Sequence, residues 1–246
     1  MRIAVISDVH GNLVGLDTVL ADLQTHPADQ IVCLGDMIQG GPQPAEVIAR
    51  LRALACPVVM GNADAWLLTG RATGAEPTTE RQLAVREWQL ARLTAEDRGY
   101  IERFEPTVEI GLGDGRTLLC FQGSPASFDD IILPTTPEEE FQRLLGPYAP
   151  ALMCGGHTHL QQICRLGDAL FFNPGSAGFA YSHQQPESNF KADPWAEYAL
   201  LTYEDGRVGL EFRRVPYQAE SLVAIYLASG RPYAEEAAQQ YRPAVS

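Results

Sequence analysis

The chain has 246 residues, of which 46% are hydrophobic and 20% charged, and its formal net charge is −13. This composition is that of an ordinary globular protein with enough length to bury a sizeable core, and it excludes a disordered chain. The negative charge argues against a long nucleic acid as partner, because nucleic-acid phosphates need Lys and Arg for neutralisation. Small anionic substrates are not excluded, since bound metal ions would reverse the local field.

The five cysteines are odd in number, show no Cys-x-x-Cys spacing and lie mostly in apolar runs. We therefore interpret them as buried, reduced thiols. The N-terminus lacks an apolar segment after a basic one, and no apolar run approaches the length of a membrane span. These features predict a soluble, cytoplasmic protein with no membrane partner.

A predicted strand over residues 2–6 leads into Asp8-Val9-His10. Side chains two apart in an extended strand point to the same side, so we expect Asp8 and His10 to leave the strand end together. Asn12 is placed to cap a helix over residues 13–24. A carboxylate beside an imidazole is a donor pair that suits a divalent transition metal.

Two further predicted strands follow, and they alternate with helices. An apolar run over residues 29–36 ends in Gly-Asp, a helix with inward residues from Val47 to Leu54 follows, and a short strand over residues 57–60 leads to Gly-Asn. Alternating strands and helices predict right-handed crossovers and a parallel sheet. Ligands gather at the carboxyl ends of such strands. The metal-capable side chains at that edge are Asp8, His10, Asp36 and Asn62.

The second half of the chain reads as helices followed by hairpins. Two helices are expected within residues 78–104, the second opened by Thr94 with Asp97 in a near capping box. The other expected elements are strands over 107–112 and 116–121, a helix starting at Pro137 with Thr136 as its cap, a buried strand over 151–154, hairpins over 161–166 with 169–172 and 197–203 with 207–213, and helices over 219–227 and 233–241. Without a repeat or a linker, we predict a single domain over 1–246, with a helical insert at about 78–104 and a polar loop at about 182–194.

A second histidine pair follows the predicted strand over residues 151–154. In Gly155-Gly156-His157-Thr158-His159 the alternation argument applies again, so His157 and His159 face the same way if the segment is extended. Three of the five histidines fall in these two motifs, which argues against histidines scattered at random. In the polar loop, Lys191 is the nearest cation that could hold a phosphate, although a surface position is the simpler interpretation.

The ordered motifs are Asp8-x-His10, Gly35-Asp36, Gly61-Asn62, Gly123-Ser124-Pro125 and Gly156-His157-Thr158-His159, supported by GDMIQGGPQPAEVI, PVVMGNADA and NPGSAG. Together they resemble the calcineurin-like binuclear metallophosphoesterase family, in particular its small bacterial and archaeal phosphodiesterase branch. The resemblance covers nearly the whole chain. It implies an α/β fold, namely a four-layer α/β/β/α sandwich of two mixed sheets flanked by helices.

The resemblance also implies two divalent metal ions, with Mn²⁺ expected first and Zn²⁺, Fe or Ni²⁺ as alternatives. One ion would be held by Asp8, His10, Asp36 and His159. The second, bridged by Asp36, would be held by Asn62, His157 and a histidine that is replaced here by Gln122. Gln122 is then either a ligand or a polar side chain filling the space. Because an amide oxygen is a weaker and harder donor than imidazole, we predict a weaker, partly occupied second site shifted toward Mn²⁺ or Mg²⁺.

The implied function is a metal-dependent phosphoesterase that hydrolyses phosphodiester or nucleotide-type phosphoanhydride bonds of a small substrate through a metal-bridging hydroxide. Asp36 and Asn62 are the expected catalytic residues. Ala63 stands where many phosphatases of the family have a histidine that protonates the leaving group, although the phosphodiesterase branch often lacks it too. The alternatives are a non-catalytic metal- or nucleotide-binding protein on the same scaffold, and a phosphomonoesterase.

Overall fold

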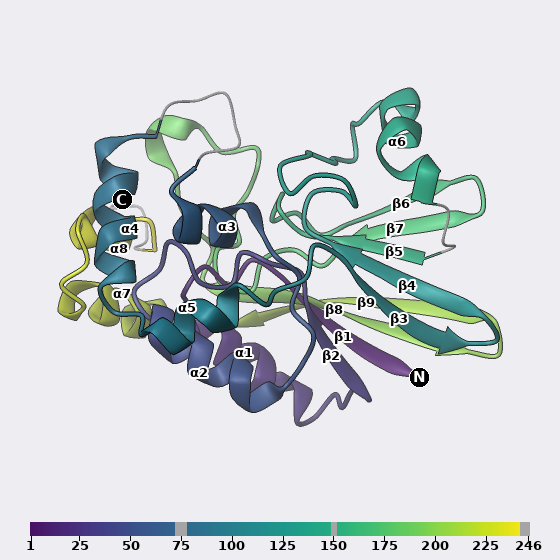
Figure 1. The fold of residues 1–246 in the computed structure, drawn as a ribbon, viewed down its shortest axis with the longest axis horizontal. Helices are drawn as coiled ribbons and strands as arrows, with labels where there is room; N and C mark the ends of the chain where they lie inside the picture. Colours follow the sequence, from purple (N-terminus) through teal and green to yellow (C-terminus); the bar gives the residue numbers. More distant parts are fainter. Residues whose placement is uncertain (72–77, 149–151, 242–246) are drawn as a thin grey trace.

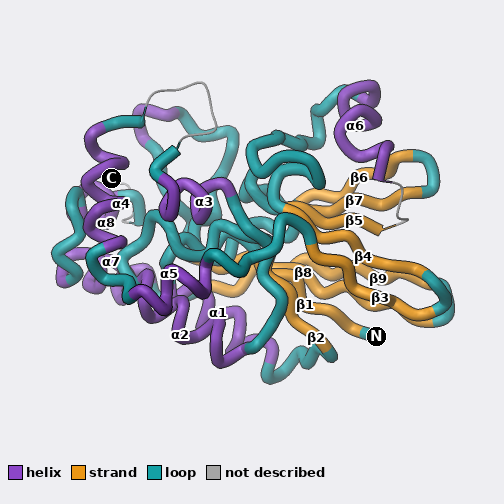
Figure 2. The backbone as a smooth tube through the Cα atoms, viewed as in Figure 1, coloured by secondary structure: helices purple, strands orange, loops and turns teal. Residues whose placement is uncertain are grey.

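Two mixed β-sheets pack against each other with helices outside them in the computed structural model, which describes residues 1–71, 78–148 and 152–241 (Figures 1 and 2). The predicted four-layer sandwich is therefore confirmed. The first sheet has the order β2-β1-β8-β9, made of β1 (Arg2–Ile6), β2 (Gln30–Cys33), β8 (Trp195–Glu204) and β9 (Arg207–Pro216). The second has the order β3-β4-β5-β7-β6, made of β3 (Val108–Gly113), β4 (Arg116–Phe121), β5 (Leu152–Gly155), β6 (Gln162–Leu166) and β7 (Ala169–Asn173).

Parallel pairs lie inside both sheets. In the first sheet β1 runs parallel to β2, and in the second β4, β5 and β7 run parallel to one another. The other pairings are antiparallel, namely the hairpins β3-β4, β6-β7 and β8-β9 and the central pair β1-β8. Because parallel strands end at a common edge, the loops after β1 and β2 lie together, as do those after β4, β5 and β7.

The strands alternate their side chains between two apolar layers. Ile3 and Val5 of β1 pack between the sheets, whereas Ala4 and Ile6 face the helices. In β4 the same alternation places Leu118 between the sheets and Phe121 on the outer face. Burial of both strand faces explains why these segments read as continuous apolar runs in the sequence.

Helices cover the outer faces and one end of the sandwich. The helices are α1 (Leu13–Leu23), α2 (Pro44–Leu54), α3 (Asn62–Thr69), α4 (Glu80–Leu90), α5 (Ala95–Ile101), α6 (Glu138–Leu145), α7 (Ala219–Ala228) and α8 (Ala234–Gln239), with 3₁₀ turns at Gly146–Tyr148 and Glu187–Asn189. Figure 1 shows α1 and α2 beside the first sheet, α6 beside the second, and α3, α4, α7 and α8 together at one end. No helix in the described part of the chain is both long and apolar enough to cross a membrane.

Two of the expected helix starts are confirmed by their hydrogen bonds. The Asn12 side chain accepts from the Gly15 backbone N–H at 3.0 Å and caps α1. Thr94 and Asp97 form a reciprocal capping box at the start of α5. These caps are local in sequence, which is why the sequence reveals them.

Two other expectations were wrong, and one helix was missed. The strand expected over residues 57–60 forms only isolated bridges, because Pro57 has no N–H to donate and the chain turns into α3 directly after Gly61. Helix α3 itself was not predicted. Pro137 is the N-cap of α6 rather than its first residue, since its ψ of 146° is extended.

Asp22 of α1 links the helix layer to the first sheet. Its carboxylate accepts from Arg213 Nε at 2.6 Å, from Arg213 Nη2 at 3.1 Å and from the Tyr198 hydroxyl at 2.6 Å. The hydrogen bond from Arg213 holds the pKa of Asp22 below its usual value, with a smaller contribution from Tyr198. This stabilisation is therefore complete above the unfolded-state pKa of about 3.9 and is lost as the pH falls through the lower folded-state pKa.

We expect Asp22→Asn to lower the unfolding free energy by about 2 kcal/mol at pH 7, the scale for hydrogen bonds to a charged group. The difference from wild type should shrink in acid below pH ~4, where the unfolded carboxyl is already protonated. Urea denaturation at both pH values checks this. Asp17→Asn is the control, because the exposed pair of Asp17 with Arg50 should contribute at most about 1 kcal/mol. Equal losses in the two variants would contradict the prediction.

Candidate metal centre

Most of the candidate ligands lie in loops beyond the strand ends, and Asn62 is the first residue of α3. Strand β1 ends at Ile6 and β5 at Gly155, so the expectation that each pair continues an extended strand was wrong. Five of the ligand candidates have a left-handed backbone, with φ of +53° at Asp8, +50° at His10, +49° at Asp36, +69° at His157 and +53° at His159. Such a backbone costs a non-glycine residue about 1–3 kcal/mol and concentrates at functional sites, where the surroundings impose it.

Backbone hydrogen bonds between neighbouring loops impose this conformation. The Asp8 N–H donates to the Gly35 carbonyl at 3.1 Å, and the His10 N–H to the Asp36 carbonyl at 2.8 Å. Gly35 has a φ of +95°, and a Cβ there would collide with Gly61 and the Gln122 side chain. The loops after β1 and β2 are therefore fixed against each other with no room for a larger residue at position 35.

The NPGSAG segment after β7 holds the same loops from the other side. The Asn173 amide donates to the Gly156 carbonyl at 2.6 Å and to the Thr158 hydroxyl at 3.1 Å. The Ser176 hydroxyl donates to the Asp8 carbonyl at 2.7 Å. Both histidine-bearing loops are thus positioned by buried polar side chains that were not predicted as such.

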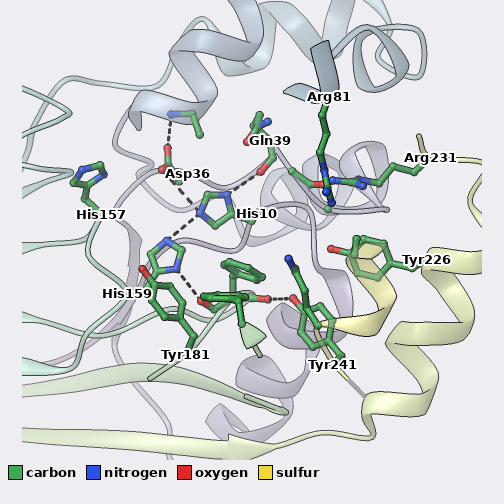
Figure 3. A pocket seen from close by; sticks show the side chains of 18 of the residues that line it. His10, Asp36, Gln39, Arg81, His157, His159, Tyr181, Tyr226, Arg231 and Tyr241 are labelled. Carbon is green, nitrogen blue, oxygen red and sulfur yellow. Dashed lines mark hydrogen bonds and ion pairs between the residues drawn. The ribbon is translucent and has the colours of Figure 1, made fainter. Parts of the chain in front are cut away.

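The side chains of Asp8, His10 and His159 converge at the centre of the site, and Figure 3 shows the two histidines with Asp36 beside them. His10 Nε2 lies 3.1 Å from His159 Nε2, which lies 3.4 Å from Asp8 Oδ1. One donor atom from each of these three residues lies within 4.8 Å of the others. Asp36 Oδ2 lies next to them, 4.0 Å from His10 Nε2. The structure therefore brings together the four side chains expected to hold the first metal.

The second nitrogen of each ring fixes its protonation. His10 Nδ1 lies 2.8 Å from the Gln39 carbonyl, and His159 Nδ1 lies 2.8 Å from the Phe179 carbonyl. A carbonyl only accepts, so the hydrogen of each neutral ring is on Nδ1 and the Nε2 atoms present lone pairs to each other. Two lone pairs and a carboxylate at this separation repel unless a cation lies among them. The donor set fits a divalent metal ion, with each imidazole oriented by a backbone carbonyl.

The surroundings act differently on the three groups. Burial opposes protonation of His159, but the neighbouring Asp8 raises the pKa of His159 above its usual value. Burial opposes ionisation of Asp8, but the neighbouring His159 and His10 lower the pKa of Asp8 to about 2. Burial, together with the charge of His159, lowers the pKa of His10 to about 4. At neutral pH the site therefore holds a carboxylate and a neutral imidazole, the states that bind metal.

The Asp36 side chain lies at the N-terminus of α3. Its Oδ1 accepts from the Ala63 N–H at 2.8 Å, which leaves Oδ2 directed to His10. Burial raises the pKa of Asp36 well above its usual value, and the charges of Asp8 and Asp64 raise it further. A metal ion beside Asp36 would relieve this excess of negative charge.

Asp64, two residues into α3, was not predicted as a site residue. Its buried carboxylate accepts from the N–H groups of Met37 and Ile38 at 2.9 Å each. These bonds fix the loop that carries Asp36 and the carbonyl of Gln39. The only sequence signal was its place in the GNADA stretch, which did not distinguish it from a turn residue.

The candidates for the second metal lie at the edge of this cluster. His157 Nδ1 lies 3.1 Å from Asn62 Oδ1, and the His157 backbone N–H donates to Asp8 at 3.1 Å. Gln122 is fully buried, and its Nε2 donates to Asp8 Oδ1 at 3.0 Å. Its Oε1 has no hydrogen-bond partner among the described residues. A buried amide oxygen without a partner is costly, and a metal ion would satisfy it.

We expect Gln122→Leu to weaken Mn²⁺ binding about 10- to 100-fold, the usual effect of losing a hydrogen bond to a metal ligand. The reason is that Asp8 loses the N–H that orients it. Calorimetric titration of the metal-free protein with Mn²⁺ measures the change. Gln162→Leu is the matched control, since that buried amide donates to the Ile132 carbonyl away from the site. Unchanged Mn²⁺ affinity in Gln122→Leu would contradict the expectation.

The site opens into a cavity of about 460 Å³ whose far wall carries two arginines, Arg81 and Arg231 (Figure 3). Neither was predicted, because nothing in the local sequence distinguishes them from surface arginines. Lys191, the cation singled out in the sequence, is not among the residues lining the cavity, and its Nζ donates to the Gln239 carbonyl at 2.9 Å.

Comparison with known proteins agrees with this geometry. The profile of the calcineurin-like phosphoesterase superfamily domain matches residues 1–205. A metallophosphoesterase from Sphaerobacter thermophilus is 25% identical with a TM-score of 0.74, over 98% of each chain. A hypothetical protein from Pyrococcus horikoshii OT3 shares the fold with a TM-score of 0.79 and 19% identity, over 99% of each chain. An uncharacterized protein from Methanocaldococcus jannaschii is 45% identical over 62 residues, 25% of this chain and 26% of that relative's length.

Proposed function

The chain belongs to the calcineurin-like phosphoesterase superfamily, and from this premise we propose that it hydrolyses phosphodiester or nucleotide-type phosphoanhydride bonds of a small substrate in a metal-dependent reaction. One observation carries the proposal. The buried Asp8 carboxylate meets the Nε2 lone pairs of His10 and His159, and both histidines line a cavity. Its volume of about 460 Å³ suits a small phosphate ester.

We propose two unequal metal sites with Mn²⁺ as the preferred ion. Asp8, His10, His159 and Asp36 would hold the first ion. The residues that would hold the second are Asp36, Asn62, His157 and Gln122. When bound, such ions polarise a phosphoryl group and lower the pKa of water. The second site is proposed to be weaker, because Gln122 offers one amide oxygen and its nitrogen is engaged with Asp8.

The side chains of this protein then have separate tasks. His10 and His159 each direct Nδ1 at a backbone carbonyl, which fixes the orientation of the ring and leaves Nε2 for a metal ion. Asp36 supplies negative charge between the two sites and is held in place by the N-terminus of α3. Asn62 turns its Oδ1 toward His157, so its amide N–H groups are available to a phosphoryl oxygen.

The leaving group is proposed to take its proton from solvent. Ala63 lines the cavity next to Asn62 and has no group that could donate one. Without a general acid, the rate should depend strongly on the acidity of the leaving group. Substrates with good leaving groups are therefore the expected ones.

A cytoplasmic location is part of the proposal. All five cysteines are unpaired, although Cys120 and Cys154 are 3.4 Å apart and Cys33 and Cys56 are 3.8 Å apart between sulfurs. Thiols this close stay reduced in a reducing compartment.

Hydrolysis of bis(para-nitrophenyl) phosphate and of para-nitrophenyl phosphate, measured side by side, tests the proposal. The protein is stripped of metal and reloaded with Mn²⁺. We expect faster turnover of the diester, and none without metal. Faster turnover of the monoester would identify a phosphomonoesterase instead. No turnover of either ester despite bound metal would favour a non-catalytic metal- or nucleotide-binding protein, the alternative that Ala63 and Gln122 support.

A further inference from the structure

Two arginines from distant parts of the chain meet across the cavity from the metal centre. Arg81 belongs to α4 and Arg231 to the connection between α7 and α8, and Figure 3 shows their guanidinium groups pointing toward each other. Arg231 is half-buried and held by carbonyls, with Nε donating to Gly40 at 2.8 Å and Nη1 to Pro232 at 2.9 Å. Its orientation is therefore fixed before any ligand binds, which reduces the entropy cost of binding one.

Within the described part of the chain, neither guanidinium forms an ion pair with a carboxylate. Each guanidinium instead lies over an aromatic ring. Arg81 is 5.2 Å from the ring centroid of Tyr233, and Arg231 is 5.6 Å from that of Tyr226. Burial lowers the pKa of Arg231 and the positive charge of Arg81 adds to that effect, whereas Tyr226 and the more distant Glu236 oppose it. Two adjacent cations in a protein of net charge −13 are best explained by an anion that binds between them.

The loop after β2 contacts both the metal centre and the arginine pair. His10 Nδ1 bonds to the carbonyl of Gln39, and Arg231 Nε bonds to the carbonyl of the next residue, Gly40. Consecutive residues are only about 3.8 Å apart between their Cα atoms, so a single loop sets the spacing between the two centres. Aromatic side chains line the space beside them, namely Phe179, Tyr181, Phe190, Tyr226 and Tyr241.

We propose that Arg81 and Arg231 bind a second anionic group of the substrate, a carboxylate or a phosphate, while the scissile phosphoryl group lies at Asp8, His10 and His159. The inference rests on the proposed function for the role of the metal centre. It specifies the substrate as a compound with two anionic groups joined by an apolar body that the aromatic side chains of the cavity can contact. Residues beyond position 205, outside the span matched by the family profile, then contribute to substrate choice.

Binding of two phosphonates that differ in one group tests the inference. Phenylphosphonate and para-carboxyphenylphosphonate are titrated into the Mn²⁺-loaded protein by calorimetry. We expect wild type to bind the carboxylated compound about 10- to 100-fold more tightly, the range for one or two charge-assisted hydrogen bonds. A third arm with para-phenylene bisphosphonate shows whether phosphate or carboxylate is the preferred second anion.

Variants of the two arginines show whether these side chains cause the tighter binding of the carboxylated phosphonate. In Arg231→Gln and in Arg81→Gln the ratio between the two phosphonates should fall to about one, whereas Arg231→Lys should retain part of it. Arg103→Gln, an exposed arginine outside the cavity, should keep the full ratio. Arg81 is also exposed, so its variant should fold even if Arg231→Gln does not.

Equal binding of the two phosphonates by wild type, or a ratio retained in both glutamine variants, would overturn the inference. Phosphonates are not hydrolysed, so this result does not depend on turnover. Failure of the proposed function would appear separately, as absence of ester hydrolysis by the Mn²⁺-loaded protein.

Discussion

Asp36→Asn should lower the turnover of an activated phosphodiester on the order of 10³-fold, the scale for losing a fixed electrostatic contact in an active site. Asparagine keeps the shape of the side chain and can still accept from the Ala63 N–H, but it removes the charge between the two proposed metal sites. Steady-state rates with bis(para-nitrophenyl) phosphate at saturating Mn²⁺ measure the effect.

The fold should survive this substitution. Burial and the neighbouring carboxylates of Asp8 and Asp64 raise the pKa of Asp36, so neutralising the residue should not destabilise the metal-free protein. Asp168→Asn, in the exposed turn between β6 and β7, is the control and should stay within about twofold of wild type, since surface changes have little effect. Turnover by Asp36→Asn within tenfold of wild type would show that this carboxylate has no part in the reaction.

Mn²⁺ should stabilise the folded protein strongly. At about 100 times its dissociation constant, a ligand that binds only the folded state adds about 2.7 kcal/mol to the unfolding free energy. For a chain of this length that corresponds to a rise in Tm of roughly 5–10 °C. The physical reason is the pair of lone-pair nitrogens 3.1 Å apart beside a carboxylate, which is unfavourable without a cation.

His10→Ala and His159→Ala should each lose most of this rise, because each removes a donor from the convergent set. His26→Ala is the matched control, since His26 lies at the end of α1 outside the cavity and should retain the full rise. Differential scanning calorimetry with and without Mn²⁺ provides the measurement. A full rise in His159→Ala would place the stabilising ion elsewhere.

The sequence predicted the fold where the physical signals are local. Continuous apolar runs identified β1 and β2, because both faces of these strands are buried. The caps at Asn12 and Thr94 were predictable because each bonds within three residues of itself. Membership of the superfamily and the sandwich architecture were also predicted from the ordered motifs.

The structure differs from the prediction where contacts between distant parts of the chain determine the conformation. Convergence of Asp8 with His10 was expected from an extended strand, but it arises from left-handed residues held by hydrogen bonds to the neighbouring loop. Asp and His adopt such a backbone more often than most residues, but it is uncommon even for them, so residue type alone does not predict it. Arg231 lies 191 residues from the Gly40 carbonyl that orients it, so its role depends on how the C-terminal helices dock. Single-domain organisation and cytoplasmic location stay predictions.

The central claim is that this chain uses a metal ion held by Asp8, His10 and His159 to hydrolyse phosphate esters. The most direct test measures bound Mn²⁺ and turnover of bis(para-nitrophenyl) phosphate in the same samples while Mn²⁺ is added to the stripped protein. We predict that turnover is absent in the stripped protein, rises with occupancy and is lost in His159→Ala together with the metal. Turnover that persists without metal, or full occupancy without turnover of any phosphate ester, would contradict the account.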